Sequence, residues 1–147
     1  MRLTIGPTTY DLTTRALVIG VGAVDGADLV EMGAGPAPVP VYATACDDAS
    51  VGRALSAGAG LVRLVQPTAA ALALCAAAGA AVVVPADAGF PADRMVPESL
   101  LVDVTAADHP TAATAVAVIR GARLVRTADA KGARRVCDVL AAVMEAR

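Results

Sequence analysis

Residues 39–64, VPVYATACDDASVGRALSAGAGLVRL, contain the unit from which the fold can be predicted. Two short runs rich in Val, Leu and Ala flank a segment with helical features, in which Asp47 or Asp48 can cap the first turn and a glycine can end the last. The order helix, Gly-Ala, strand recurs at residues 77–84 and 119–126. Repetition of this unit predicts a parallel sheet with right-handed crossovers.

Other apolar runs extend this pattern along the chain. Their apolarity is continuous rather than alternating, which is typical of strands buried on both faces of a parallel sheet. The predicted strands are residues 17–21, 28–32, 39–44, 61–65, 81–84, 100–103 and 123–126. Helices are predicted at about 48–58, 67–78, 110–120 and 130–146, the third of them starting at Pro110 or Thr111. RLTIG and TYDLT, residues 2–6 and 9–13, predict a small antiparallel hairpin.

Chain length limits the architecture. The 147 residues suit one domain. Residues 22–27 and 33–38 are too few for helices, because a βαβ crossover takes at least about 10–12 residues. A complete (β/α)₈ barrel takes about 250 residues. We therefore predict a single α/β domain over residues 1–147, a shortened TIM-barrel-like fold with about seven mostly parallel strands and four main helices. An open flavodoxin-like sheet is the alternative.

Composition and charge exclude several classes of protein. Hydrophobic residues make up 56% of the chain and aromatic residues only 2%, so Ala, Val and Leu must fill a sizeable core and disorder is excluded. The formal net charge is −2, and no run of Lys or Arg forms the footprint that nucleic acid requires. We expect no nucleic-acid partner.

The cysteines, the first residues of the chain and one uncharged segment indicate where in the cell the protein is located. Cys46, Cys75 and Cys137 are widely spaced, which predicts small core residues in a reduced, cytoplasmic protein without a metal site. The first residues, MRLTIGPTTYDL, do not have the pattern of a signal peptide. Residues 68–86 are uncharged, but Gly79 interrupts them and their second half is β-branched, so we expect a helix and a strand rather than a membrane span.

Four segments follow one another in an order that suggests a family: LTIGPTTYDLTTRALVIGVGAV (3–24), GADLVEMGAG (26–35), residues 39–64, and TAVAVIRGARLVRTADAKGARRVCDVLAAV (114–143). They resemble segments of the dihydropteroate synthases and their pterin-binding relatives. The first resembles the opening hairpin and first strand of that family, and the second resembles its second strand. The third resembles the third and fourth strands with their helix, and the fourth resembles the last helix, the last strand and the closing helix. The resemblance implies a (β/α)₈ barrel.

The resemblance also implies a chemistry. Enzymes of this family join a pterin pyrophosphate to p-aminobenzoate and release pyrophosphate. The family places acidic and amide side chains at strand ends to bind the pterin ring, a Lys near it, and an Arg-x-His at the last strand to hold the anion. This arrangement agrees with the general position of barrel active sites, at the carboxyl ends of the strands.

Several positions depart from the family pattern. Ala23 stands where the first strand of the family has Asn, and the loop that follows that Asn is absent. Arg63 and Leu64 replace an Asn-Asp pair, and Ala128 replaces the His of the last strand. The family's seventh-strand Lys has no counterpart, since the only lysine, Lys131, lies at the start of the final predicted helix.

Three site positions are retained in kind: Asp103, Arg126 and Glu31. We predict these as ligand-binding residues, with no catalytic and no metal-binding residue. Each has a structural alternative. Asp103 can be a half-exposed residue that caps the next loop, Arg126 can pair with Asp129 instead of holding an anion, and Glu31 can be the partner of an Arg such as Arg63.

These departures favour a catalytically degenerate paralogue, because loss of one preorganised group already costs about 10²–10³ in rate. We expect at most residual binding of a pterin or a phosphate-type anion, no cofactor, and a homo-oligomer or a complex with another protein. One alternative is an active dihydropteroate synthase completed by a partner chain. A third is an interaction module whose exposed sheet edge, left by a missing strand, pairs with a partner. His109 is expected to be an exposed residue at a helix start.

Overall fold

The structure is a computed structural model that describes residues 1–33, 39–85 and 88–147. Its strands are β1 (Arg2–Ile5), β2 (Thr8–Asp11), β3 (Leu17–Gly20), β4 (Leu29–Glu31), β5 (Val41–Ala45), β6 (Ala59–Leu64), β7 (Ala81–Val84), β8 (Met95–Pro97), β9 (Leu101–Asp103) and β10 (Leu124–Thr127). Its helices are α1 (Asp48–Ser56), α2 (Ala69–Ala78), α3 (Pro110–Ile119) and α4 (Ala130–Glu145), with short 3₁₀ turns η1 (Ala92–Arg94) and η2 (Glu98–Leu100).

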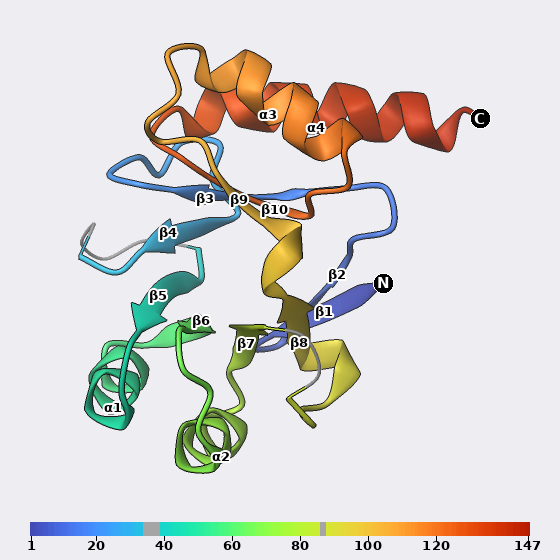
Figure 1. Cartoon of the computed structure of the whole chain (residues 1–147). Helices are drawn as coiled ribbons and strands as arrows, with labels where there is room; N and C mark the ends of the chain where they lie inside the picture. The colour runs from blue at the N-terminus through green and yellow to red at the C-terminus, as the bar shows by residue number, and fades with distance from the viewer. Residues whose placement is uncertain (34–38, 86–87) are drawn as a thin grey trace.

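Eight strands form one sheet, in the order β8-β7-β6-β5-β4-β3-β10-β9, and all of the neighbouring pairs are parallel. The sheet curves into a nearly closed barrel, with α3 and α4 outside one part of it and α1 and α2 outside the opposite part (Figure 1). The TIM-barrel-like prediction is confirmed, and the open flavodoxin-like alternative is wrong.

The edges of the sheet are β8 and β9, which follow each other in the chain and are joined by η2. The strands predicted from the sequence did not include β8. With β8 the barrel sheet has eight strands, so the barrel is shortened by having fewer helices rather than fewer strands. Residues 22–27 contain no helix, as their number predicts. Of the short connection expected at 33–38, residues 34–38 lie outside the described residues.

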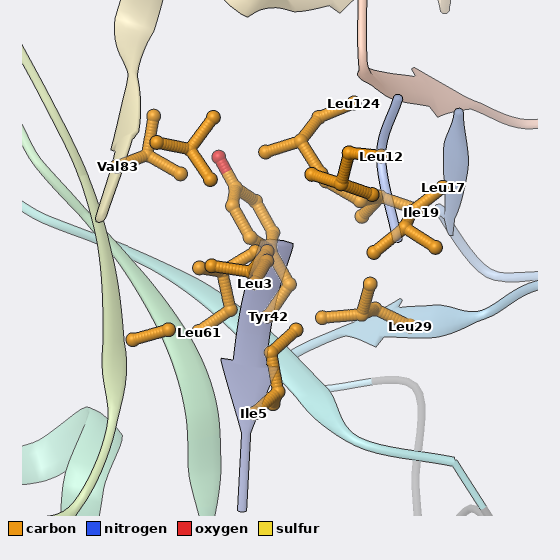
Figure 2. Packing of buried hydrophobic residues seen from close by; sticks show 12 residues of the cluster. Leu3, Ile5, Leu12, Leu17, Ile19, Leu29, Tyr42, Leu61, Val83 and Leu124 are labelled. Carbon is orange, nitrogen blue, oxygen red and sulfur yellow. The ribbon is translucent and has the colours of Figure 1, made fainter. Parts of the chain in front are cut away.

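The barrel interior is filled by side chains that alternate with outward-facing ones along each strand. Leu17, Ile19, Leu29, Tyr42, Leu61 and Leu124 belong to one buried cluster. Figure 2 shows Leu3 and Ile5 of the hairpin strand β1 packed against Tyr42 in that cluster. The β1–β2 hairpin, confirmed by its antiparallel register, therefore closes the amino end of the barrel, where a Cβ at Gly60 would come within 2.8 Å of Ile5.

Outward-facing strand residues pack under the helices. Val18 and Val125 lie in a cluster with Cys137 of α4, and Val62 and Val82 lie in a cluster with Cys75 of α2. Both cysteines are buried as expected, but Cys46 is exposed just after β5, so the prediction of three core cysteines is wrong at this position. Within the described part of the chain, no helix has the length and apolarity that crossing a membrane requires.

Helix ends follow the sequence signals. The Asp47 carboxylate accepts a 2.7 Å hydrogen bond from the Ser50 amide, and the Ser50 hydroxyl accepts a 3.0 Å bond from the Asp47 amide, which completes a capping box on α1. Pro110 is the first residue of α3, where its missing N–H costs nothing. Gly79 ends α2 in the left-handed conformation. These local signals explain why the four helices were predictable.

Candidate functional site

Three inward-facing charged residues gather at the carboxyl ends of neighbouring barrel strands. Glu31 ends β4, Asp103 ends β9, and Arg126 is the last but one residue of β10. Each follows, two positions later, a leucine that packs in or against the interior cluster, so all three face inward. The strand order β4-β3-β10-β9 brings them together although Glu31 and Arg126 are 95 residues apart in the chain.

Arg126 is the centre of this group. Its Nη2 donates to both carboxylate oxygens of Glu31 at 2.8 Å, and its Nε donates to Glu31 Oε1 at 3.1 Å. Its Nη1 donates to Asp103 Oδ2 at 2.6 Å and to the Thr105 hydroxyl at 3.5 Å. All three nitrogens of the guanidinium therefore donate in this group. The Arg126 and Glu31 side chains are 23% and 25% exposed, and that of Asp103 is 50% exposed.

The structure thus brings together the three residues predicted as a site and corrects two of their expected partners. Glu31 pairs with Arg126 and not with Arg63. Arg126 does not pair with Asp129, whose carboxylate instead caps α4 by accepting a 3.0 Å bond from the Gly132 amide. Asp103 is half-exposed and accepts a hydrogen bond from the Thr105 amide in the following loop, which confirms the alternative in which it caps that loop. It also accepts a hydrogen bond from Arg126.

These contacts keep Asp103 and Arg126 charged. Burial acts to raise the pKa of Asp103, but hydrogen bonds from the Thr105 hydroxyl (2.6 Å) and amide (2.9 Å) and from Arg126 outweigh it, so this pKa lies below its usual value. Burial acts to lower the pKa of Arg126, and its bonds to Glu31 and Asp103 reverse the direction, so this pKa is raised. Near neutral pH, Asp103 is therefore a carboxylate and Arg126 a cation.

A second ion pair, which the sequence reasoning missed, lies at the same end of the barrel. Arg63 of β6 is in register with Thr44 and Val83, and its Nε donates to Glu98 Oε1 at 2.8 Å; its Nη2 contacts the same oxygen. Arg63 interrupts an apolar strand at an inward-facing position, and this was a usable signal. Glu98 follows the unpredicted strand β8, so no signal indicated its position.

Tyr42 lies beneath both ion pairs. It is 1% exposed, and its phenolic oxygen accepts a 3.3 Å bond from the Thr44 hydroxyl. Burial raises its pKa, while the Thr44 hydrogen bond and the positive charges of Arg63 and Arg126 act in the opposite direction. The strand register agrees with this position, since Glu31 lies opposite Tyr42 and Arg63 lies opposite Thr44, two residues further along β5. The two ion pairs therefore flank the same inward-facing end.

The lysine and the histidine lie away from this end of the barrel. Lys131 is exposed at the start of α4 and pairs with Asp25 at 3.2 Å. His109 is exposed at the position before α3 and makes no capping hydrogen bond through its side chain, so it is an exposed residue at a helix start as expected. Among residues 1–33, 39–85 and 88–147, no three His, Cys, Asp or Glu side chains are grouped so that they could hold a metal ion.

The fold is that of the dihydropteroate synthases. The structure matches the enzyme from Vibrio fischeri ES114 with a TM-score of 0.74 at 13% identity, covering 99% of this chain and 98% of that one. It matches a Yersinia pestis enzyme with a pterine-sulfa conjugate (TM-score 0.72, 16% identity, 99% and 100% covered). It also matches a Xanthomonas albilineans enzyme with indole-2-carboxylic acid and 6-chloroguanine (TM-score 0.72, 18% identity, 97% and 98% covered).

Sequence comparison adds no closer assignment, since no protein-family model and no curated protein matches the chain. TM-scores of 0.72–0.74 across nearly the whole chain establish a dihydropteroate synthase-like fold, and identities of 13–18% carry the comparison no further than the fold. The predicted resemblance is confirmed at this level. The function must be argued from the residues at the carboxyl ends of the strands.

Proposed function

We propose that the chain is a dihydropteroate synthase-like protein that has lost the synthase reaction and retains binding of a pterin among Glu31, Asp103 and Arg126. The observation that supports this proposal is that the three side chains have free acceptor positions but no nitrogen that is not already donating. Every nitrogen of the Arg126 guanidinium already donates, whereas Glu31 Oε2 and Asp103 Oδ2 each accept a single bond from it. Each of these oxygens retains an acceptor position. The group is therefore a receptor for N–H donors.

A pterin fits a receptor of this kind. The amino-pyrimidinone edge of the ring presents adjacent N–H donors, and carboxylates accept such donors in charge-assisted hydrogen bonds. Arg126 has a positioning role here, because its guanidinium holds both carboxylates in place. The resemblance also implies a phosphate-type anion as a ligand. Such an anion needs hydrogen-bond donors, and those of Arg126 already serve Glu31 and Asp103, so this ligand is disfavoured.

The loss of catalysis rests on the residues that the resemblance assigns to the reaction. Lys131 is paired with Asp25 on the surface, and Ala23 and Ala128 stand where the family has Asn and His. The other candidate function is an active synthase to which a partner chain supplies the missing groups, in folate biosynthesis. The placement of Asp103 and Arg126 at the strand ends is compatible with it, and an activity measurement separates the two.

Pterin itself is expected to raise the melting temperature of the purified chain. At 100 times its dissociation constant a ligand stabilises the folded state by about 2.7 kcal/mol, which corresponds to a shift of roughly 5–10 °C for a domain of this size. Asp103→Asn should abolish most of the shift, because it removes the carboxylate charge that attracts the N–H donors. Asp93→Asn, an exposed residue of η1, is the matched control and should respond like the wild type. Equal shifts in all three proteins would exclude this site.

We also propose that the chain associates with a second copy of itself through the outer face of α3 and α4. Four large apolar side chains are exposed there: Val116 (49%), Ile119 (70%), Val139 (62%) and Val143 (47%). Beside them, an apolar groove separates α3 from β9 and contains Val102 and Val104. The 3₁₀ turn η2 alone connects β8 to β9, so within the described part of the chain no α-helix follows β8 to cover that side of β9. Exposed apolar side chains on two neighbouring helices are typical of an interface.

Charge favours a second copy as the occupant. Asp108 precedes α3 and Arg120 follows it, and neither forms an ion pair within the described part of the chain. Two α3 helices packed antiparallel about a two-fold axis would place each Asp108 opposite the Arg120 of the other copy. The short edge strands are a poorer contact, because each has three residues and Pro97 lacks an N–H donor.

Sedimentation at micromolar concentration is expected to give a dimer. Ile119→Asp should give a monomer that still folds, because the side chain is exposed, with a melting temperature lowered only by the loss of association. Leu74→Asp on α2 should leave the dimer intact. Arg120→Asp should weaken the dimer and Asp108→Arg added to it should restore it. A monomeric wild type, or a dimer that ignores Ile119→Asp, would refute this interface.

Location in the cytoplasm is proposed from the cysteines. All three are free thiols, and Cys75 and Cys137 are buried in the core, where burial raises their pKa and keeps them unreactive. A reducing compartment suits such a set of thiols.

A further inference from the structure

An exposed arginine at a strand end ordinarily offers a planar fork of donors to a phosphate or sulfate. In this chain that fork is already occupied. Glu31 accepts three hydrogen bonds from the Nε and Nη2 edge of Arg126, at 2.8, 2.8 and 3.1 Å, in the bidentate arrangement that a phosphate would adopt. Asp103 and Thr105 accept from the remaining nitrogen. An anion that reaches Arg126 therefore has to displace the Glu31 carboxylate.

The second arginine at this end gives an anion no better position. Arg63 donates through two nitrogens to Glu98. The five charged groups are Arg63 and Arg126 against Glu31, Glu98 and Asp103, so two positive charges face three negative ones and the sum is −1. Both guanidinium groups are neutralised by internal carboxylates, and the remaining charge repels an approaching anion.

We propose that Glu31 is a specificity-determining residue that occupies the anion-binding fork of Arg126, so that the barrel end accepts uncharged heterocycles and rejects phosphate-type anions such as pyrophosphate. The inference rests on the proposed function in placing the ligand at this end of the barrel. It adds that the chain takes the free heterocycle and not its pyrophosphate ester. The proposal also implies that removal of one carboxylate creates an anion site.

Calorimetric titration with inorganic pyrophosphate, at fixed ionic strength and pH 7.5, tests this directly. The wild type is expected to show no measurable binding. Glu31→Ala frees the Nε and Nη2 edge of Arg126 and changes the sum of the five charges from −1 to zero, so its affinity for pyrophosphate should be at least about tenfold higher than that of the wild type. Glu31→Gln keeps the shape of the side chain and serves as the second variant should the first fail to fold.

Two controls localise the effect. The double variant Glu31→Ala with Arg126→Ala lacks the guanidinium and should lose the gained binding. Asp93→Ala removes the same amount of negative charge at an exposed site that forms no ion pair within the described residues, and it should bind no better than the wild type. Together they separate a site at Arg126 from a general effect of net charge.

Three outcomes would overturn the proposal: pyrophosphate binding by the wild type that equals that of Glu31→Ala, no gain in either folded Glu31 variant, or a gain that survives loss of Arg126. A parallel titration with pterin separates this proposal from the proposed function. Gained pyrophosphate binding without any pterin binding to the wild type would leave the role of Glu31 standing and reject pterin as the ligand.

Discussion

The purified chain, supplied with pterin pyrophosphate and p-aminobenzoate, is expected to form product at less than about one hundredth of the rate of an intact dihydropteroate synthase. Loss of one preorganised group costs about 10²–10³ in rate, and the proposed function has several such groups lost together. Lys131 is paired with Asp25 on the surface, the side chain of Ala128 offers no donor, and Arg126 already donates to Glu31 and Asp103.

The control for this assay is one of the structurally similar enzymes, such as that of Yersinia pestis, measured under identical conditions. Turnover by the chain alone within two orders of magnitude of that enzyme would contradict the loss of catalysis. Activity that appears only when a second protein from the native host is added would instead support the alternative in which a partner completes the site.

Gly20→Ala is expected to cost more than about 4 kcal/mol of unfolding free energy, the range in which single substitutions become exceptional. Gly20 is the last residue of β3, and the chain turns back over it immediately. A Cβ built there would lie 2.0 Å from the Ala23 carbonyl oxygen and 3.0 Å from the Ala27 side chain. Neither neighbour can move independently of the loop backbone. Because whole domains are stable by only about 5–15 kcal/mol, this loss is a large part of the total and should strongly lower the urea concentration at which the variant unfolds.

The matched control is Gly52→Ala in α1, where an added Cβ meets no other atom within 4 Å. Ala is preferred to Gly in a helix interior by roughly 0.5–1 kcal/mol, so this variant should be slightly more stable than the wild type. Urea unfolding followed by circular dichroism measures both. A Gly20→Ala midpoint equal to that of the wild type would show that the loop after β3 shifts freely, which would weaken the account of how β3 leads into β4.

The elements that local chemistry specifies were predictable from the sequence. The continuous apolar runs marked seven barrel strands, and helix boundaries followed from residues such as Asp47, Pro110 and Gly79. The strand Met95–Pro97 was missed because it is three residues long and its last residue is a proline, which is a signal against a strand. Only its pairing with β7 in the assembled sheet makes it a strand.

Partners within the site depend on the closure of the sheet, and this is why they were predicted less well than the residues themselves. The resemblance singled out Glu31, Asp103 and Arg126, and the structure brings them together. The contact between Glu31 and Arg126 arises because β4 and β10 lie on either side of β3, an order that no local pattern contains. The Arg63–Glu98 pair was missed for the same reason.

The central claim is that the inward-facing end of the barrel at Glu31, Asp103 and Arg126 binds a pterin. A titration of the ¹⁵N-labelled chain with pterin, followed by amide chemical shifts, tests it most directly. We predict that the largest changes in chemical shift occur at Glu31, Asp103, Thr105 and Arg126. The amide chemical shifts of the β1–β2 hairpin, at the opposite end of the barrel, should not change. The absence of shifts at millimolar pterin, or shifts confined to the hairpin end, would contradict it.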